Sequence, residues 1–177
     1  MPVYAFRTIS LLLIFSLGPY SRAAEIRTPE YSLSISARSP EQIGAFYEAR
    51  GFPEKAVTRL QQHCYLTAYF RNTSQNIIWL DLDNWIFHSS GKTVPRRDRA
   101  YWKQIWKDMD LAMRFQSTFR WTLMPEQLDF HPDEREGGNL ILPYTGQPLE
   151  LEATIRIQGP QSETIKTIHM SNIQCQR

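Results

Sequence analysis

The alternation of side chains that decides the fold occupies residues 64–87 and reads CYLTAYFRNTSQNIIWLDLDNWIF. In its first part, Leu66, Ala68 and Phe70 fall on the same side as Cys64, whereas the residues between them fall on the other side. A period of two is that of a β-strand. The polar residues 72–76 predict a turn, and residues 77–87 predict a second, longer strand.

This second strand is apolar on both of its faces. One face carries Ile78, Leu80 and Leu82, and the other carries Ile77, Trp79, Trp85 and Phe87. A strand of this kind lies inside a sheet and needs cover on both sides. We therefore expect helices to cover its second face and to bury Trp79 and Trp85.

Two segments have the signals of helices. Ser39, Pro40 and Gln42 form a capping box with proline at the first helical position, which predicts two short helices within residues 39–63. Asp98 predicts the start of another helix, which continues to residue 113. We expect Tyr101 and the residues one and two turns after it to face the core.

The remaining segments supply further strands and loops. Strands are predicted at residues 31–37, 115–123, 140–142, 149–157 and 165–175, the last one with a bulge near Ser171. Residues 24–30 are predicted to be a loose leader, and residues 89–97 and 125–138 are predicted to be loops. About seven short strands indicate a mainly β chain, a two-sheet sandwich with inserted helices near 39–63 and 98–113 that cover one face.

The join between the first two strands has a further implication. Residues 70–74, Phe-Arg-Asn-Thr-Ser, end one strand in small polar residues just before a long apolar strand. This pattern resembles the immunoglobulin-like domains that bacteria export, and the resemblance covers roughly residues 64–175. It implies a fold and no activity. Asn72-Thr73-Ser74 also matches the acceptor pattern for N-glycosylation.

The first 23 residues have the features of a cleaved secretory signal peptide. Arg7 is followed by an apolar run over residues 9–17, a helix break at Gly18-Pro19, and small residues at Ser21 and Ala23. A spanning helix needs about 20 apolar residues, roughly twice the length of this run. We expect cleavage after Ala23, which leaves residues 24–177 as one globular domain, periplasmic or extracellular, with no transmembrane segment.

Charge and cysteine content bound the class of protein. The chain has 20 Lys and Arg against 18 Asp and Glu, and loss of Arg7 and Arg22 with the signal makes the two counts equal. Nucleic acid is therefore not an expected partner. Cys64 and Cys175 are an even number of cysteines in an exported chain, which predicts a disulfide. The alternative is two buried thiols too far apart to bridge.

The most unusual segment combines basic and aromatic residues. Residues 92–120 contain eight Lys and Arg against three Asp, whereas residues 126–152 contain seven acids and one base. Arg, Trp and Tyr are enriched where proteins bind one another. The predicted binding surface consists of Arg96, Arg97, Arg99, Trp102, Lys103 and Trp106. Trp102 or Trp106 is expected to stay partly exposed. In the alternative interpretation, the tryptophans belong to the core and the two charged segments neutralise each other.

Two other functions remain open. His63, His169 and Met170 resemble a copper-type ligand set, provided that Cys64 is a free thiol and that the first and last strands pair. A hydrolase site could assemble in space without a sequence motif. The chain has no catalytic motif, and no cofactor is predicted. The leading hypothesis is therefore a non-enzymatic envelope accessory protein that binds another envelope or secreted protein, with an anionic glycan or a lipid headgroup as other partners.

Overall fold

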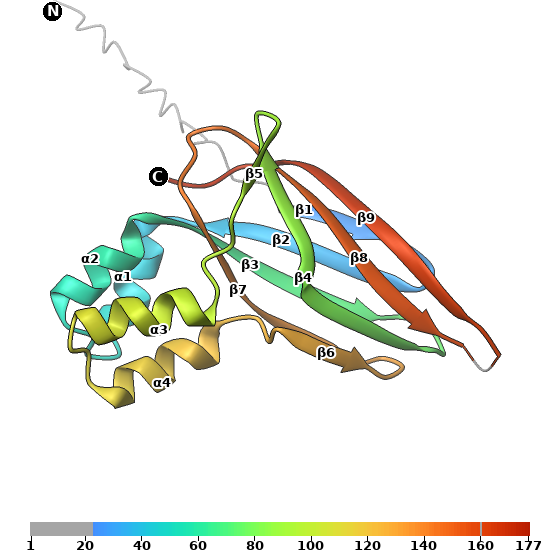
Figure 1. Ribbon diagram of the computed structural model, residues 1–177, viewed down its shortest axis with the longest axis horizontal. Coiled ribbons are helices and arrows are strands. Elements are labelled where there is room, and N and C mark those ends of the chain that lie inside the picture. Colours follow the sequence, from blue (N-terminus) through green and yellow to red (C-terminus); the bar gives the residue numbers. More distant parts are fainter. Residues whose placement is uncertain (1–22, 160) are drawn as a thin grey trace, which may run out of the picture.

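A computed structural model describes residues 23–159 and 161–177 of the chain, which are mainly β (Figure 1). The strands are β1 (Ala24–Arg27), β2 (Tyr31–Arg38), β3 (His63–Asn72), β4 (Ile77–Ser89), β5 (Lys92–Val94), β6 (Gln127–Phe130), β7 (Arg135–Pro143), β8 (Leu149–Gln158) and β9 (Glu163–Ile173). The helices are α1 (Pro40–Glu48), α2 (Glu54–Gln61), α3 (Arg99–Asp108) and α4 (Met113–Thr122). The predicted signal peptide, Ala23 apart, lies outside the described residues.

The strands form two antiparallel sheets. Sheet A has the order β1-β2-β3-β7, and sheet B has the order β5-β4-β8-β9, with β6 also paired to β4. The inward side chains of the two sheets form one core, in which Leu33, Phe70 and Ile155 are almost wholly buried. This confirms a mainly β chain with two antiparallel sheets. An immunoglobulin-like strand arrangement stays a prediction.

An irregularity in β4 changes which of its side chains are buried. Leu80 pairs with Ile155 and Trp85 pairs with Ala153, so β4 advances five positions while β8 advances two. The odd number of extra residues reverses the alternation. Trp85 therefore joins the core between the sheets with 3% of its surface exposed, whereas Trp79 lies on the outer face and is 37% exposed. The prediction that helices bury both tryptophans is wrong.

The helices cover sheet A instead of β4. They gather at one end of the molecule (Figure 1) and form a second core with Tyr65 of β3 and Ile141 of β7. The capping box at Ser39 and Gln42 is present as predicted, and Asp98 caps α3 through its contact with the backbone N–H of Tyr101. The starts of α1 and α3 were thus predicted correctly, but α3 ends at Asp108 and not near residue 113, and the surface on which the helices pack was not predicted.

The segment 115–123 is largely a helix, and its prediction as a strand is wrong. Phe115, Phe119 and Leu123 recur every fourth residue, a spacing that satisfies both a period of two and one stripe of a helix. All three are buried in the helical core. Trp121 distinguishes the two structures, because a helix turns it about 200° away from Phe119. It is 82% exposed.

Three segments predicted to lack regular structure contain strands. The leader 24–30 includes β1, which pairs with β2. The loop 89–97 includes β5, joined to β4 by Ser90 and Gly91, whose φ angles are both positive, as a tight hairpin turn requires. The acidic loop 125–138 includes β6 and the start of β7. These short edge strands are held by backbone pairing and lack a strong apolar alternation.

The predicted disulfide is present. Cys64 and Cys175 are bonded, with their Cα atoms 5.3 Å apart. The bulge expected near Ser171 is also present, since Leu149 pairs with Ile173 while Leu151 pairs with Met170. Because the two cysteines are bonded, the alternative of two separated thiols is wrong.

Asn72 is not presented at the surface. Its side chain is buried and donates hydrogen bonds to the carbonyl oxygens of Asn76, at 2.6 Å, and Phe130, at 2.9 Å. A glycosylation acceptor must be accessible, so in the folded chain the acceptor pattern has a structural role at the turn before β4.

Candidate functional site

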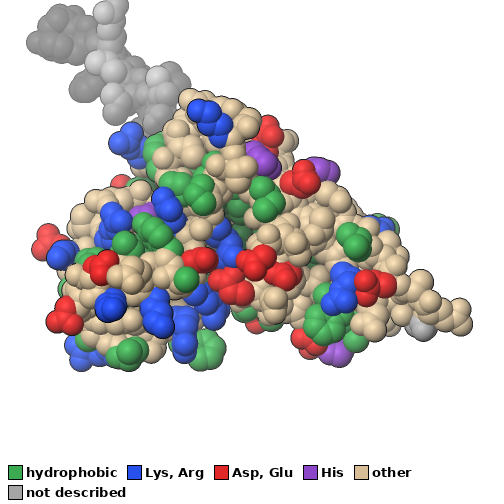
Figure 2. Space-filling model, in the orientation of Figure 1, with side chains coloured by type: hydrophobic (Ala, Val, Ile, Leu, Met, Phe, Trp, Pro, Cys, Tyr) green, Lys and Arg blue, Asp and Glu red, His purple; other side chains and the backbone are tan. Residues whose placement is uncertain are grey.

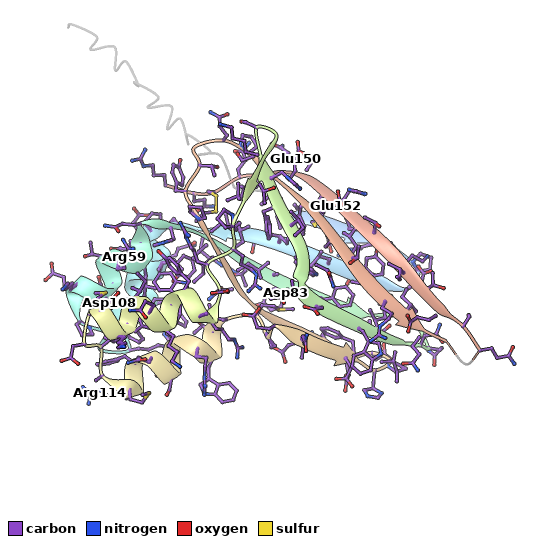
Figure 3. The ribbon with its side chains drawn as sticks, viewed as in Figure 1. Arg59, Asp83, Asp108, Arg114, Glu150 and Glu152 are labelled. Carbon is purple, nitrogen blue, oxygen red and sulfur yellow. A yellow bond between two sulfur atoms is a disulfide. The ribbon has the colours of Figure 1, made fainter. Side chains whose placement is uncertain are left out.

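Arg96 belongs to an ion-pair cluster and not to an open binding surface. Its guanidinium lies 2.6 Å from the Glu126 carboxylate and 3.6 Å from that of Asp83, and its side chain is only 13% exposed. Asp83 lies in the irregular part of β4 (Figure 3). Arg96 thus joins the segment before α3 to the segment before β6, as the alternative of mutual neutralisation anticipated.

Arg97 is also held by neighbouring groups. Its guanidinium lies over the ring of Tyr101, 4.5 Å from the ring centre, and its backbone N–H donates to Ile141 at 2.7 Å. These contacts attach the start of α3 to the outer side of β7. Arg96 and Arg97 therefore position α3.

Trp102 and Trp106 are both buried, so the prediction that one of them stays exposed is wrong. They are 1% and 2% exposed, stack on each other with ring centres 4.9 Å apart, and contact the ring of Phe119. The reason is the presence of α4, which supplies a second helix against which this stripe packs. The stripe that begins at Tyr101 was expected to face the core, but it is only half-buried, on the side of α2, so the two stripes have exchanged the predicted roles.

A groove of about 490 Å³ lies between α3 and α4. Its base is formed by the buried aromatic residues just described, and its sides carry Arg99, Lys103 and Arg120. Met113, Gln116 and Ser117 of α4 complete the lining together with Ala100 and Leu123. Figure 2 shows Lys and Arg side chains gathered over these two helices. The structure therefore brings together Arg99, Trp102, Lys103 and Trp106 of the predicted surface.

The groove is basic at its sides and has an exposed apolar side chain at its edge. None of its lining residues is acidic, and Lys103 and Arg120 are exposed. Arg99 has one distant carboxylate, that of Glu126 at 3.9 Å. Met113 is 71% exposed at the edge, which adds an apolar contact surface. The α4 residues of the groove were missed in the sequence because their segment was interpreted as a strand.

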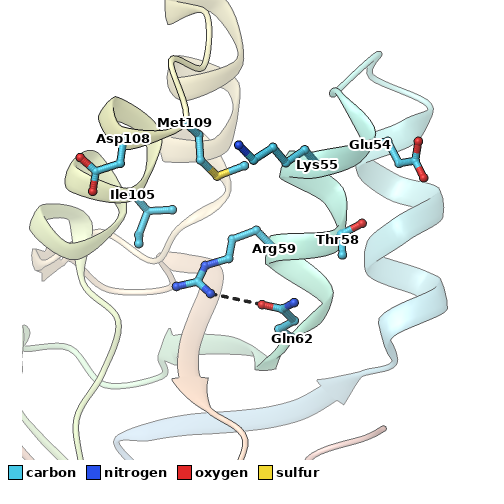
Figure 4. Close-up of a pocket in the computed structure, with 8 residues that line it drawn as sticks. All are labelled: Glu54, Lys55, Thr58, Arg59, Gln62, Ile105, Asp108 and Met109. Carbon is cyan, nitrogen blue, oxygen red and sulfur yellow. Dashed lines mark hydrogen bonds between the residues drawn. The ribbon is translucent and has the colours of Figure 1, made fainter.

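A second groove, of about 630 Å³, separates α2 from α3 and has no excess of either charge among its lining residues (Figure 4). Its charges balance, with Lys55 and Arg59 on α2 against Glu54 and Asp108. Figures 3 and 4 show Arg59 and Asp108 on facing helices. Arg59 is engaged, because it donates to Gln62 at 3.2 Å and to the Tyr101 hydroxyl at 3.3 Å. We therefore take the α3–α4 groove as the candidate site.

The copper-type ligand set is not assembled. The sulfur of Cys64 belongs to the disulfide, and β3 does not pair with β9. His169 is exposed and Met170 is buried, so the two side chains lie on opposite faces of β9. His63 contacts the Arg59 carbonyl oxygen at 3.0 Å, and burial lowers the pKa of its imidazole. The described residues contain no group of three or more His, Cys, Asp or Glu side chains that could hold a metal ion.

The hydrolase hypothesis gains no candidate residues from the geometry. Within the described ranges, no hydrogen bond joins a serine to a histidine. His131, on the acidic segment, lies 3.7 Å from Asp129 on an exposed turn.

Comparisons with known proteins add little. No family model matches the chain, and no curated protein matches it. Among solved structures it is similar to ycdA of Bacillus subtilis, a protein provisionally assigned as a lipoprotein, with 11% identity and a TM-score of 0.45. The match covers 85% of this chain and 39% of that one, so the chain spans about two fifths of the length of its structural neighbour. Among the helices described, none has the length and apolar character needed to cross a membrane.

Proposed function

We propose that this protein is an exported, non-enzymatic binding module, whose α3–α4 groove captures an acidic segment with apolar anchors from another envelope or secreted protein. The observation that carries the proposal is the set of three cations, Arg99, Lys103 and Arg120, around an aromatic base. A groove of this kind can accept an amphipathic peptide, since apolar side chains enter it and acidic ones reach its sides.

Export is supported by two features. The predicted signal peptide directs the chain out of the cytoplasm. The disulfide between Cys64 and Cys175 is stable in an oxidising compartment and rare in a reducing one.

A protein partner is favoured over a lipid headgroup by the apolar part of the groove. A headgroup would use the cations alone, whereas the exposed side chain of Met113 offers contact to apolar side chains. The charges at the sides would orient the partner and speed its approach.

The test compares two pairs of charge reversals on the same helices. Lys103→Glu with Arg120→Glu alters the groove, and Lys107→Glu with Arg114→Glu alters cations of α3 and α4 outside its lining. All four side chains are exposed, so both variants should keep thermal midpoints near that of the wild type. Each protein is used to capture partners from the exported protein fraction, with quantification by mass spectrometry.

We expect at least one protein to be captured by the wild type and by the control pair and to be lost with the groove pair. Equal capture by the two variants would overturn the proposal. Binding that is confined to vesicles of anionic lipid would also overturn it, and would assign the groove to a membrane surface.

A further inference from the structure

A further pocket, distinct from the two grooves described above, lies on the other side of α4, where α1 and α4 meet the uncovered part of sheet A. Its volume is about 470 Å³. Its residues come from β2, α1, β3, α4 and β7, which are far apart in the chain. It is separate from the α3–α4 groove, because the two cavities share no lining residue. Arg120 lines the groove, whereas its neighbour Trp121 lines this pocket.

Three aromatic rings at the edge of this pocket are left exposed. Trp121 is 82% exposed, Tyr69 is 55% exposed and Phe46 is 37% exposed. Gly137 of β7 leaves room for the Tyr69 ring, because a Cβ atom at that position would overlap the ring. The guanidinium of Arg50 lies over the Phe46 ring, 3.5 Å from its centre, so Trp121 and Tyr69 are the rings on which a ligand ring can stack.

The floor of the pocket is polar and already ordered. Arg38 donates from Nε to the Thr67 hydroxyl at 2.9 Å, and that hydroxyl donates to Oδ1 of Asn139 at 3.0 Å. These two hydrogen bonds fix the plane of the Arg38 guanidinium through Nε and leave its two terminal nitrogens available. Among the described residues, no carboxylate forms an ion pair with Arg38. A guanidinium fork of this kind matches a carboxylate.

The other polar groups of the pocket are also positioned as donors. The Oδ1 atom of Asn139 is already an acceptor, which directs the donor capacity of its amide nitrogen elsewhere. Gln42 is fixed in the same way, because its Oε1 accepts from the backbone N–H of Ser39 in the capping box. No acidic side chain lines the pocket. The floor therefore offers planar donors and one cation to an acceptor-rich, negatively charged ligand.

We propose that this pocket binds a carboxylated sugar. The apolar face of the sugar ring stacks on Trp121 and Tyr69, the carboxylate forms paired hydrogen bonds with Arg38, and ring hydroxyls accept from Asn139 and Gln42. A sugar combines these needs in one small unit, namely a stacking face, an anion and several acceptors. The volume of the pocket lies within the usual range for small-ligand sites.

The test uses methyl β-glucuronide and digalacturonic acid, with the methyl ester of each as a neutral ligand of nearly the same shape. Binding is measured by calorimetry and by changes in NMR amide shifts on the full chain with its disulfide intact. The variants are Arg38→Gln, Arg38→Lys and Trp121→Ala. The control is Trp79→Ala, which removes another exposed tryptophan beside an arginine, since Arg156 lies 5.1 Å from its ring.

We expect at least one acid to bind and its ester to bind about tenfold more weakly or worse, as for loss of a hydrogen bond to a charged group. Arg38→Gln should weaken binding of the acid by a similar factor and leave the ester unaffected. Arg38→Lys should restore only part of the loss, because lysine keeps the charge without the fork. Trp121→Ala should weaken the acid and the ester alike, by about fivefold, and Trp79→Ala should change neither.

Three results would overturn this proposal: no binding of either acid, equal binding of acid and ester, or binding that is insensitive to Trp121. An acetylated Phe-Asp-Phe-Asp peptide that binds through Arg38 and Trp121 when the sugars do not would assign the pocket to acidic peptides instead. Reversal of Lys103 and Arg120 should leave sugar binding intact, so failure of the α3–α4 groove proposal and failure of this one are distinguishable.

Discussion

Cys64 and Cys175 link the two sheets of this protein covalently. Cys64 lies in β3 of sheet A, and Cys175 lies just after β9 of sheet B, 111 positions later, with the two Cα atoms 5.3 Å apart. No backbone pairing joins β3 to β9. The disulfide therefore ties together two segments of different sheets that no backbone pairing joins.

Removal of this link should lower the stability of the fold. We expect the double variant Cys64→Ala, Cys175→Ala to lose about 2–5 kcal/mol of unfolding free energy, because the unfolded chain regains the freedom of a long loop. Urea unfolding of the variant and of the reduced wild type should give similar losses. An unchanged midpoint in both would show that the bond contributes nothing to stability.

The two tryptophans of β4 should differ sharply on truncation. Trp85→Ala should cost about 3–5 kcal/mol, because it opens a cavity between the sheets. Trp79→Ala should cost about 1 kcal/mol or less, since it loses a hydrogen bond to Gln158 and a contact with Arg156 on the outer face of the sheet and opens no cavity in the core. Chemical unfolding of both variants checks the prediction, and a large loss for Trp79→Ala would mean that its face is covered.

Arg96 and Glu126 should be energetically coupled. A double-mutant cycle with alanine at both positions should give about 1–2 kcal/mol, because the pair is short and Arg96 is largely buried. The pair Arg71–Asp133 is the control, with both side chains more than half exposed. Its coupling should be below about 0.5 kcal/mol. Equal values for the two cycles would contradict a structural role of Arg96 in positioning α3.

His63 should make stability depend on pH. Burial against the helices lowers the pKa of its imidazole below the ordinary value of 6.5. Below that value the unfolded chain takes up the proton more readily than the folded chain does, so the unfolding free energy should fall as the pH is lowered through this range. The drop in thermal midpoint between about pH 7.5 and about pH 5 should be smaller for His63→Gln than for the wild type. A drop of equal size would show that His63 does not contribute.

Part of the fold could be predicted because its signals are local and have one interpretation. The strands within 64–87 alternate over many residues, and the capping box at Ser39 involves atoms three residues apart. The disulfide followed from the number of cysteines and the predicted compartment. Each of these predictions was made without knowledge of the tertiary structure, and the structure confirms it.

The candidate sites depended on α4, which local signals could not identify. Phe115, Phe119 and Leu123 fit a strand and a helix equally well, and the choice of a strand placed Trp121 on the same face as Phe119 and Arg120 on the opposite face. With α4 in place, Trp102 and Trp106 become core residues, and both candidate pockets lie beside it.

The sequence by itself determined the β character, the starts of α1 and α3 and the cysteine pair, because these depend on neighbouring residues and on composition. Only the tertiary structure decided which side of each element is buried. The irregular pairing of β4 with β8 turned Trp79 outward and Trp85 inward, and the packing of α4 on α3 converted a predicted binding surface into the base of a groove. Burial is a relation between segments distant in the chain, and for this reason a local pattern specifies the period of an element without specifying its partner.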